Sequence, residues 1–105
     1  MGRKALEALT ETMFYTLMAF SGRELCGAEV TEFVERKTKG RIRMGPGTLY
    51  TILARFQEEG LIQEVDSGEG GRRRDYRITA KGRACYLEEV ERLRACLTDA
   101  ESEGI

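Results

Sequence analysis

The stretch MGPGTLYTILARFQEEGLI, residues 44–62, decides the fold. Pro46 suits the first turn of a helix, because the N–H that proline lacks has no helical partner there. Gly60 stands where a glycine with left-handed backbone ends many helices. Between them the apolar residues recur with helical spacing and predict one buried stripe, formed by Leu49, Ile52, Leu53 and Phe56. The stretch therefore predicts a helix with one face in the core and the other turned outward.

The outward face of this helix is small and polar, with arginine at its margin. On a helical projection it carries Gly47, Tyr50, Thr51, Ala54 and Glu58, with Thr48 and Arg55 at one margin. Small side chains would let the helix lie close to the floor of a DNA groove. Thr51 can contact a base edge, Tyr50 can reach a phosphate and Arg55 can do either. The alternative is an ordinary solvated surface.

The flanking segments predict three more helices and a β-hairpin. Helical spacing covers Lys4–Phe20 and about 26–38, and Thr79 can cap a last helix. LIQEV (61–65) and RRDYRIT (73–79) predict two strands, joined by the glycine-rich DSGEGG. A mainly α chain with this order is typical of a winged helix-turn-helix. In that fold the third helix enters the major groove, and the hairpin, or wing, reaches the flanking backbone or minor groove.

Basic residues gather in two segments, although the net charge of the 105 residues is only −1. Residues 36–57 include six basic and no acidic side chains, and residues 72–83 hold six basic residues against the single Asp75. Clustered arginines favour the DNA backbone, whose counterions they displace. The predicted contacts are Lys39, Arg41 and Arg43 before the third helix and Arg72, Arg73, Arg74 and Arg77 in the wing. The alternative for the wing is an edge strand that charge protects from aggregation.

The last predicted helix has an apolar seam of its own. Its members are spaced four, three and four residues apart, as in a heptad: Tyr86, Val90, Leu93 and Leu97. A lone chain of this length could not easily bury that seam, so we expect a homodimer. Residues 1–79 would then form the winged helix-turn-helix DNA-binding domain, and residues 80–105 a C-terminal dimerisation helix with an acidic tail. The alternative is packing of the seam within one chain.

The same residues resemble the PadR-like transcriptional regulators. The family signature combines GTLY, an acidic exit that ends in G-L-I and a wing that returns through R-x-Y-x-[IL]-T-x-x-G. Here these segments are residues 47–50, 58–62 and 74–82, and the resemblance extends from about Lys4 to Leu97. Ala28 departs from it, because an aromatic residue is common there. The resemblance implies a homodimeric repressor or activator of a pseudo-palindromic operator. It also implies that the last helix packs against the partner's first helix, through Leu6, Leu9, Met13, Tyr86, Val90, Leu93 and Leu97.

We interpret the chain as a sequence-specific DNA-binding regulator, a ligand-responsive repressor. Some relatives release DNA when a planar aromatic compound binds between their dimer helices. This chain has no tryptophan, so the stacking platform of some relatives is missing. A packed core is the favoured role of Met13, Phe14, Met18, Leu93 and Cys96. The presence of a small aromatic or hydrophobic effector is left open. The alternative function is a winged helix that binds protein and makes no specific DNA contact.

The composition excludes several other classes of protein. Because no histidine is present, the usual zinc sites and catalytic triads are excluded, and no Walker loop occurs, so we predict no enzyme, metal or cofactor. No apolar run is long enough to span a membrane and no signal peptide is evident, so we expect the cytoplasm. Cys26, Cys85 and Cys96 form no CxxC pair and suit apolar packing. Thiol sensing by Cys85 or Cys96 is the alternative.

Overall fold

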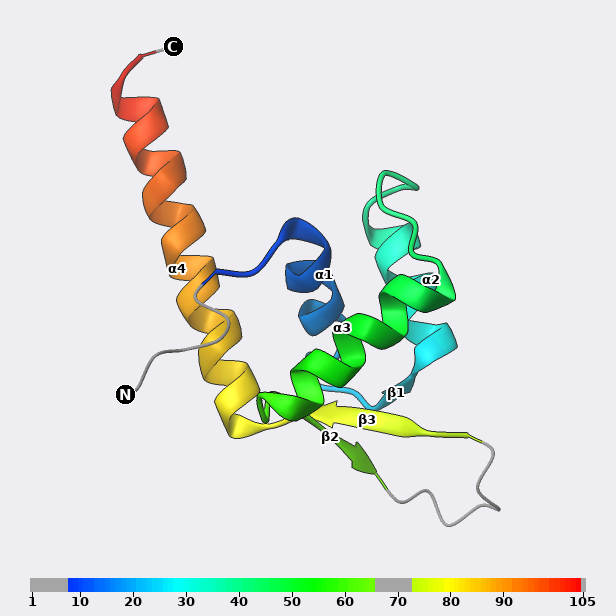
Figure 1. The fold of residues 1–105 in the computed structure, drawn as a ribbon. Helices are drawn as coiled ribbons and strands as arrows, with labels where there is room; N and C mark the ends of the chain where they lie inside the picture. The colour runs from blue at the N-terminus through cyan, green and yellow to red at the C-terminus, as the bar shows by residue number, and fades with distance from the viewer. Residues whose placement is uncertain (1–7, 66–72, 105) are drawn as a thin grey trace.

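Four helices and a small antiparallel sheet make up residues 8–65 and 73–104, the part of the chain that this computed structural model describes (Figure 1). The helices are α1 (Glu11–Ala19), α2 (Gly27–Lys37), α3 (Pro46–Glu58) and α4 (Ala80–Ser102), and the strands are β1 (Leu25–Cys26), β2 (Ile62–Val65) and β3 (Asp75–Ile78). The predicted winged helix-turn-helix order is confirmed. No helix of these residues is long and apolar enough to cross a lipid bilayer.

The α3 helix begins and ends where the sequence predicts. Pro46 is its first residue. Gly60 has a φ of +76°, and the Leu61 N–H reaches back to the Phe56 carbonyl oxygen at 2.8 Å, so the left-handed glycine closes the last turn. The predicted stripe is buried in the core: Leu49, Ile52, Leu53 and Phe56. The outward face of α3 is therefore fixed by the burial of the opposite face.

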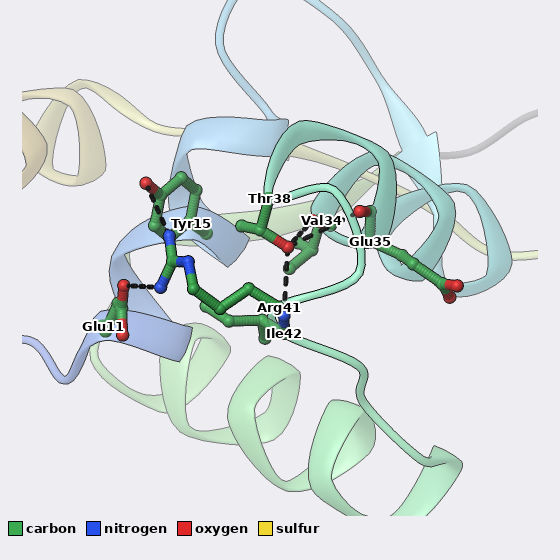
Figure 2. Close-up of polar contacts among 7 residues, drawn as sticks. All are labelled: Glu11, Tyr15, Val34, Glu35, Thr38, Arg41 and Ile42. Carbon is green, nitrogen blue, oxygen red and sulfur yellow. Dashed lines mark hydrogen bonds and ion pairs between the residues drawn. The ribbon is translucent and has the colours of Figure 1, made fainter.

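The α2 helix is closed at both ends by local hydrogen bonds, with Cys26 and Thr38 as its cap residues. At the start, the Cys26 N–H donates to Glu29 Oε1 at 3.0 Å. At the end, the buried Thr38 hydroxyl donates to the Val34 carbonyl at 2.8 Å and accepts the Ile42 N–H at 3.0 Å (Figure 2). These bonds fix the turn that leads from α2 to α3.

The sheet has three strands in the order β1-β3-β2, all antiparallel. The β2–β3 pair is the predicted hairpin, with Ile62 opposite Ile78. The DSGEGG connection lies outside the described residues. The two-residue strand β1 was not predicted, and it places Cys26 opposite Asp75. This register brings the start of α2 beside the base of the wing.

The predicted start of the first helix was wrong. The prediction placed it at Lys4, but α1 begins at Glu11, and residues 8–10 are not helical. Thr10 caps the N-terminus of α1, because its side chain accepts the Met13 N–H at 3.1 Å. Leu9 is nevertheless buried, so its apolar character reflects packing of a non-helical segment in the core.

The α4 helix is joined rigidly to the end of α3. The Thr79 hydroxyl accepts the Gly82 N–H at 2.9 Å, and the Thr79 N–H donates to the Leu61 carbonyl at 2.9 Å. A Cβ at Gly82 would lie 2.1 Å from that carbonyl oxygen, so only glycine allows this close approach. The helix packs against α1, which lies between α2 and α4, and then extends away from the rest of the chain (Figure 1). All residues from 91 to 104 are exposed.

Candidate nucleic-acid interface

The outward face of α3 is open to solvent. Tyr50 is 55% exposed, and the other predicted contacts on this helix are also exposed: Gly47, Thr48, Thr51 and Arg55. A Cβ added at Gly47 would meet no atom within 4 Å. An exposed, small-residue face opposite a buried stripe can approach a groove closely.

Tyr50 is held against the start of α2. A Cβ at Gly27 would lie 2.9 Å from the Tyr50 hydroxyl oxygen, so glycine makes room for the ring. The ring lines a hollow of about 410 Å³ between α2, α3 and the wing. The residues that line this hollow are Cys26, Gly27, Ala28, Tyr50, Arg73, Arg74 and Tyr76. The structure thus brings the outward face of α3 and the base of the wing to one place.

The predicted wing arginines are all engaged with carboxylates where the structure describes them. Arg73 donates through Nε to Asp75 Oδ1 at 2.8 Å and through Nη2 to Glu29 Oε1 at 2.9 Å. Two looser pairs join Arg74 to Glu64 at 3.6 Å and Arg77 to Glu24 at 3.8 Å. Arg72 lies outside the described residues. In the free chain these three wing arginines are thus ion-paired, and DNA phosphates would have to compete with the carboxylates.

The basic residues before α3 do not share one orientation. Figure 2 shows the Arg41 guanidinium turned toward α1, where it pairs with Glu11 and contacts the Tyr15 hydroxyl. Glu11 raises the pKa of Arg41, chiefly through this hydrogen bond. Arg43 Nε lies 3.5 Å from Glu35 Oε2, and Lys39 is exposed. The DNA contacts of these three residues stay predictions. Of the three, Arg41 has its guanidinium bonded to α1.

Sequence reasoning missed Glu29, which links the wing to α2. Its Oε1 accepts both the Cys26 N–H and the Arg73 guanidinium. The Cys26 hydrogen bond, followed by that of Arg73, holds the pKa of Glu29 below its usual value despite partial burial. The three-residue step from a helix cap to a glutamate is a known capping pattern and was the available signal. The link to Arg73 depends on strand pairing that the sequence does not show.

The Cys26 thiol and the Glu29 and Asp75 carboxylates form a compact group of potential metal ligands. One ligand atom from each lies within 4.8 Å of the others. The Arg73 guanidinium is hydrogen-bonded to both carboxylates and balances part of their charge. The cation that the two carboxylates bind in this structure is therefore the guanidinium of Arg73.

The predicted dimer seam divides into a covered and an uncovered half. Tyr86 stacks on Phe14 with ring centroids 5.2 Å apart and planes at 13°, so this end packs within the chain. Val90 and Met13 are partly buried and Leu9 is buried. Leu93 and Leu97 are 40% and 60% exposed. Leu6 lies outside the described residues. The intramolecular alternative thus holds for Tyr86, while the outer half of the seam lacks cover in the described chain.

An ion pair between the buried Glu89 and the half-exposed Arg92 lies beside the seam. Glu89 is 5% exposed, and Arg92 donates to it through Nε at 3.0 Å and through Nη2. These hydrogen bonds hold the pKa of Glu89 below its usual value against the opposing effect of burial, and the Leu9 backbone N–H adds to them. A hollow of about 360 Å³ adjoins the pair, lined by Leu9, Glu11, Phe14, Tyr15, Glu89, Arg92 and Leu93. Of the residues expected around an apolar space, only Phe14 and Leu93 line this hollow.

The cysteines differ in exposure. Cys26 and Cys85 are partly buried, and Cys96 is exposed on α4. Apolar packing therefore suits Cys26 and Cys85 better than Cys96. Thiol sensing by Cys85 or Cys96 stays an open alternative.

The chain is similar in sequence to known transcriptional regulators. The transcriptional regulator PadR-like family matches residues 16–88. The transcriptional regulator Rv3488 of Mycobacterium tuberculosis is 39% identical over 67 residues, which are 63% of this chain and 60% of that protein. The chain thus spans about three-fifths of the length of the curated relatives that it matches.

The fold is also similar to solved structures of regulators. A transcriptional regulator from Clostridium thermocellum superposes with a TM-score of 0.77 and 25% sequence identity, over 87% of each chain. A PadR family transcription regulator from Clostridium difficile gives a TM-score of 0.73 at 18% identity, over 89% of this chain and 97% of that one. Both superpositions agree with the element order described above.

Proposed function

Because the chain belongs to the PadR-like family of transcriptional regulators, we propose that it binds double-stranded DNA sequence-specifically through α3 and the wing. The observation that carries the proposal is the meeting of Tyr50 from α3 with Arg73 and Arg74 from the wing around one hollow. A helix in the major groove and a wing on the adjacent backbone need this adjacency. The family consists of transcriptional regulators, not enzymes.

The proposed DNA contacts divide into two kinds. Thr51 and Thr48 face outward on α3 and are suited to base edges. Tyr50, the basic turn residues and the wing arginines are suited to phosphates, which supply affinity but little sequence information. The full proposed set is Lys39, Arg41, Arg43, Gly47, Thr48, Tyr50, Thr51, Arg55, Arg72, Arg73, Arg74 and Arg77.

The active form that we propose is a homodimer formed through α4. The support is the exposure of Leu93 and Leu97 on a helix that leaves the rest of the chain. The interface would join α4 to the first helical segment of the partner, with residues 1–79 as the DNA-binding domain and 80–105 as the dimerisation arm. A two-fold axis would place two α3 helices roughly 34 Å apart, on successive turns of a pseudo-palindromic operator.

The regulatory role that we propose is ligand-responsive repression in the cytoplasm. A dimer seated on an operator blocks access to the promoter. The hollow of about 360 Å³ beside Phe14, Tyr15 and Leu93 adjoins the proposed dimer seam. A small aromatic or hydrophobic compound bound there would shift α4 against α1 and change the spacing of the two α3 helices.

The first test is a titration of the protein into labelled DNA from upstream of its own gene, followed by fluorescence anisotropy. A scrambled duplex is the control, and both are measured at two salt concentrations. We expect tighter binding to the native duplex and a steep loss of affinity with salt. Weak and salt-insensitive binding to both duplexes would instead favour a module whose arginines bind an acidic protein.

A further inference from the structure

The strongest unassigned feature of the interface is the Glu29–Arg73–Asp75 network. Two carboxylates, from α2 and β3, hold one guanidinium at 2.9 Å and 2.8 Å. The same Glu29 oxygen is fixed by the Cys26 N–H at 3.0 Å, so the acceptor is held in place by backbone. The network therefore has a defined geometry, unlike the looser Arg74–Glu64 pair at 3.6 Å.

The network lies on the surface that α3 and the wing share. Arg73 lines the hollow with Tyr50, and Glu29 lies in the first turn of α2, next to Cys26 and Gly27 on the same hollow. Arg73 is about half exposed, so a DNA phosphate can approach its remaining N–H groups. A phosphate that does so comes close to the charge of Glu29, and like charges at short range repel.

We propose that Glu29 competes with DNA phosphate for Arg73, so that Glu29 sets the affinity of the wing for DNA. This inference rests on the proposed DNA binding. In the free chain the Arg73–Glu29 pair holds the wing base against α2, and Asp75 fixes the same guanidinium from within the wing. On DNA, the guanidinium bonds to a phosphate oxygen, and the Arg73–Glu29 bond is lost or weakened. Glu29 keeps the Cys26 N–H, so α2 stays capped while the arginine is released.

The direction of the ionisation equilibria agrees with this competition. Asp75, and then Glu29, raise the pKa of Arg73, and the pKa of Glu29 is lowered by Cys26 and Arg73. Both partners are therefore fully charged near neutral pH. The contest for Arg73 is between two anions, one in the protein and one in the DNA.

The test is a double-mutant cycle with Glu29→Gln and Arg73→Ala, measured by anisotropy on the upstream duplex. Glutamine keeps an oxygen that accepts the Cys26 N–H, so only the charge is removed. We expect Glu29→Gln to bind DNA about two- to fivefold more tightly, the range typical of an exposed ion pair. The gain should disappear in the Arg73→Ala background. Unchanged or weaker binding by Glu29→Gln would overturn the proposal, and so would an equal gain without Arg73.

Glu32→Gln is the matched control. Glu32 is exposed on the same helix, and its carboxylate forms no ion pair among residues 8–65 and 73–104. Its removal changes the net charge equally, so a smaller gain that is the same with and without Arg73 is expected. A gain equal to that of Glu29→Gln would reduce the effect to general electrostatics and refute the specific role of Glu29.

A second measurement separates this inference from the proposed function. In the free protein, the Glu29 carboxyl carbon is titrated by NMR in the wild type and in Arg73→Ala. We expect the pKa of Glu29 to rise when Arg73 is removed. If the pKa does not rise although the wild type binds DNA, the competition is refuted and DNA binding stands. If it rises but the wild type binds no duplex, the ion pair is real and the proposed function fails.

Discussion

Thr51 is the residue at which we expect base reading to be concentrated. It is exposed on the outward face of α3, and a threonine hydroxyl and methyl can contact base edges. We predict that Thr51→Ala changes the order of preference among duplexes with single base-pair substitutions. The free energy of unfolding should change by less than about 0.5 kcal/mol. Anisotropy and thermal unfolding check the two statements, and an equal weakening of every duplex would contradict them.

Arg74 is the wing residue most suited to a phosphate contact. It is largely exposed, and its pair with Glu64 is long at 3.6 Å. We predict that Arg74→Ala weakens all duplexes to a similar degree and lowers the slope of log affinity against log salt by about one. Arg94→Ala is the control, because it removes the same charge from α4. A salt slope equal to that of the wild type would show that Arg74 does not contact DNA.

Glu89 makes stability depend on acid pH. Its folded-state pKa is lowered, first by the hydrogen bonds from Arg92, so the unfolded chain binds its proton more readily. The charged pair therefore stabilises the fold above the unfolded pKa, and this contribution is lost as the pH falls through the folded pKa. We predict that Glu89→Gln costs about 1–2 kcal/mol at neutral pH, as for a buried charged hydrogen bond. In strong acid the two proteins should unfold alike; an equal gap at both pH values in denaturant titrations would refute this.

Burial of single residues could be predicted from the sequence, but the partners of the charges could not. Helical spacing alone predicted that Leu53 and Phe56 lie in the core, because the apolar stripe of an amphipathic helix is stable only when it is buried. Arg41 could be assigned only to a basic turn. Its pair with Glu11 joins residues 30 positions apart and depends on how α1 packs. For the same reason, the sequence did not predict that Arg73 pairs with Glu29, which lies 44 positions away.

At the scale of elements, the predictions succeeded where the signals are local. Pro46 and Gly60 determine where α3 begins and ends, through their own backbone preferences. The strand β1 was missed because two residues carry no period and their partners lie about fifty positions away. The predicted start of α1 was wrong because Leu9 fits helical spacing and yet packs into the core from outside the helix, before the Thr10 cap.

Gly82 tests the junction between α3 and α4. We predict that Gly82→Ala destabilises the fold, because a Cβ there would lie 2.1 Å from the Leu61 carbonyl oxygen. Overpacking of this kind typically costs about 1–3 kcal/mol. Gly47→Ala is the matched control, since that helical position has open space and alanine favours helix. Denaturant unfolding should separate the two variants, and an equally stable Gly82→Ala protein would show that α4 shifts freely.

Over the whole molecule, charge is segregated along the direction in which α4 leaves the fold. Two clusters of basic residues lie around α3 and the wing, whereas Asp99 and Glu101 lie in the last turns of α4 and Glu103 caps its C-terminus. The C-terminal end of α4 projects away from α3 and the sheet (Figure 1). An acidic end far from the proposed DNA-binding surface leaves the local positive field there intact, although the net charge is −1.

The assembly itself is tested on the outer half of the seam. Leu93 and Leu97 are exposed in the single chain, so glutamate at both positions should leave its core unchanged. We predict that Leu93→Glu with Leu97→Glu gives folded monomers, because two carboxylates cannot be buried unpaired against their symmetry mates. DNA binding should weaken strongly, since each monomer would then hold one half-site. Light scattering and anisotropy provide the two readouts. Leu87→Glu, at an exposed leucine on another face of α4, should remain dimeric. If the double variant stayed dimeric, the dimer interface would have to lie elsewhere than this seam. If the wild type were monomeric, the proposed homodimer would be refuted.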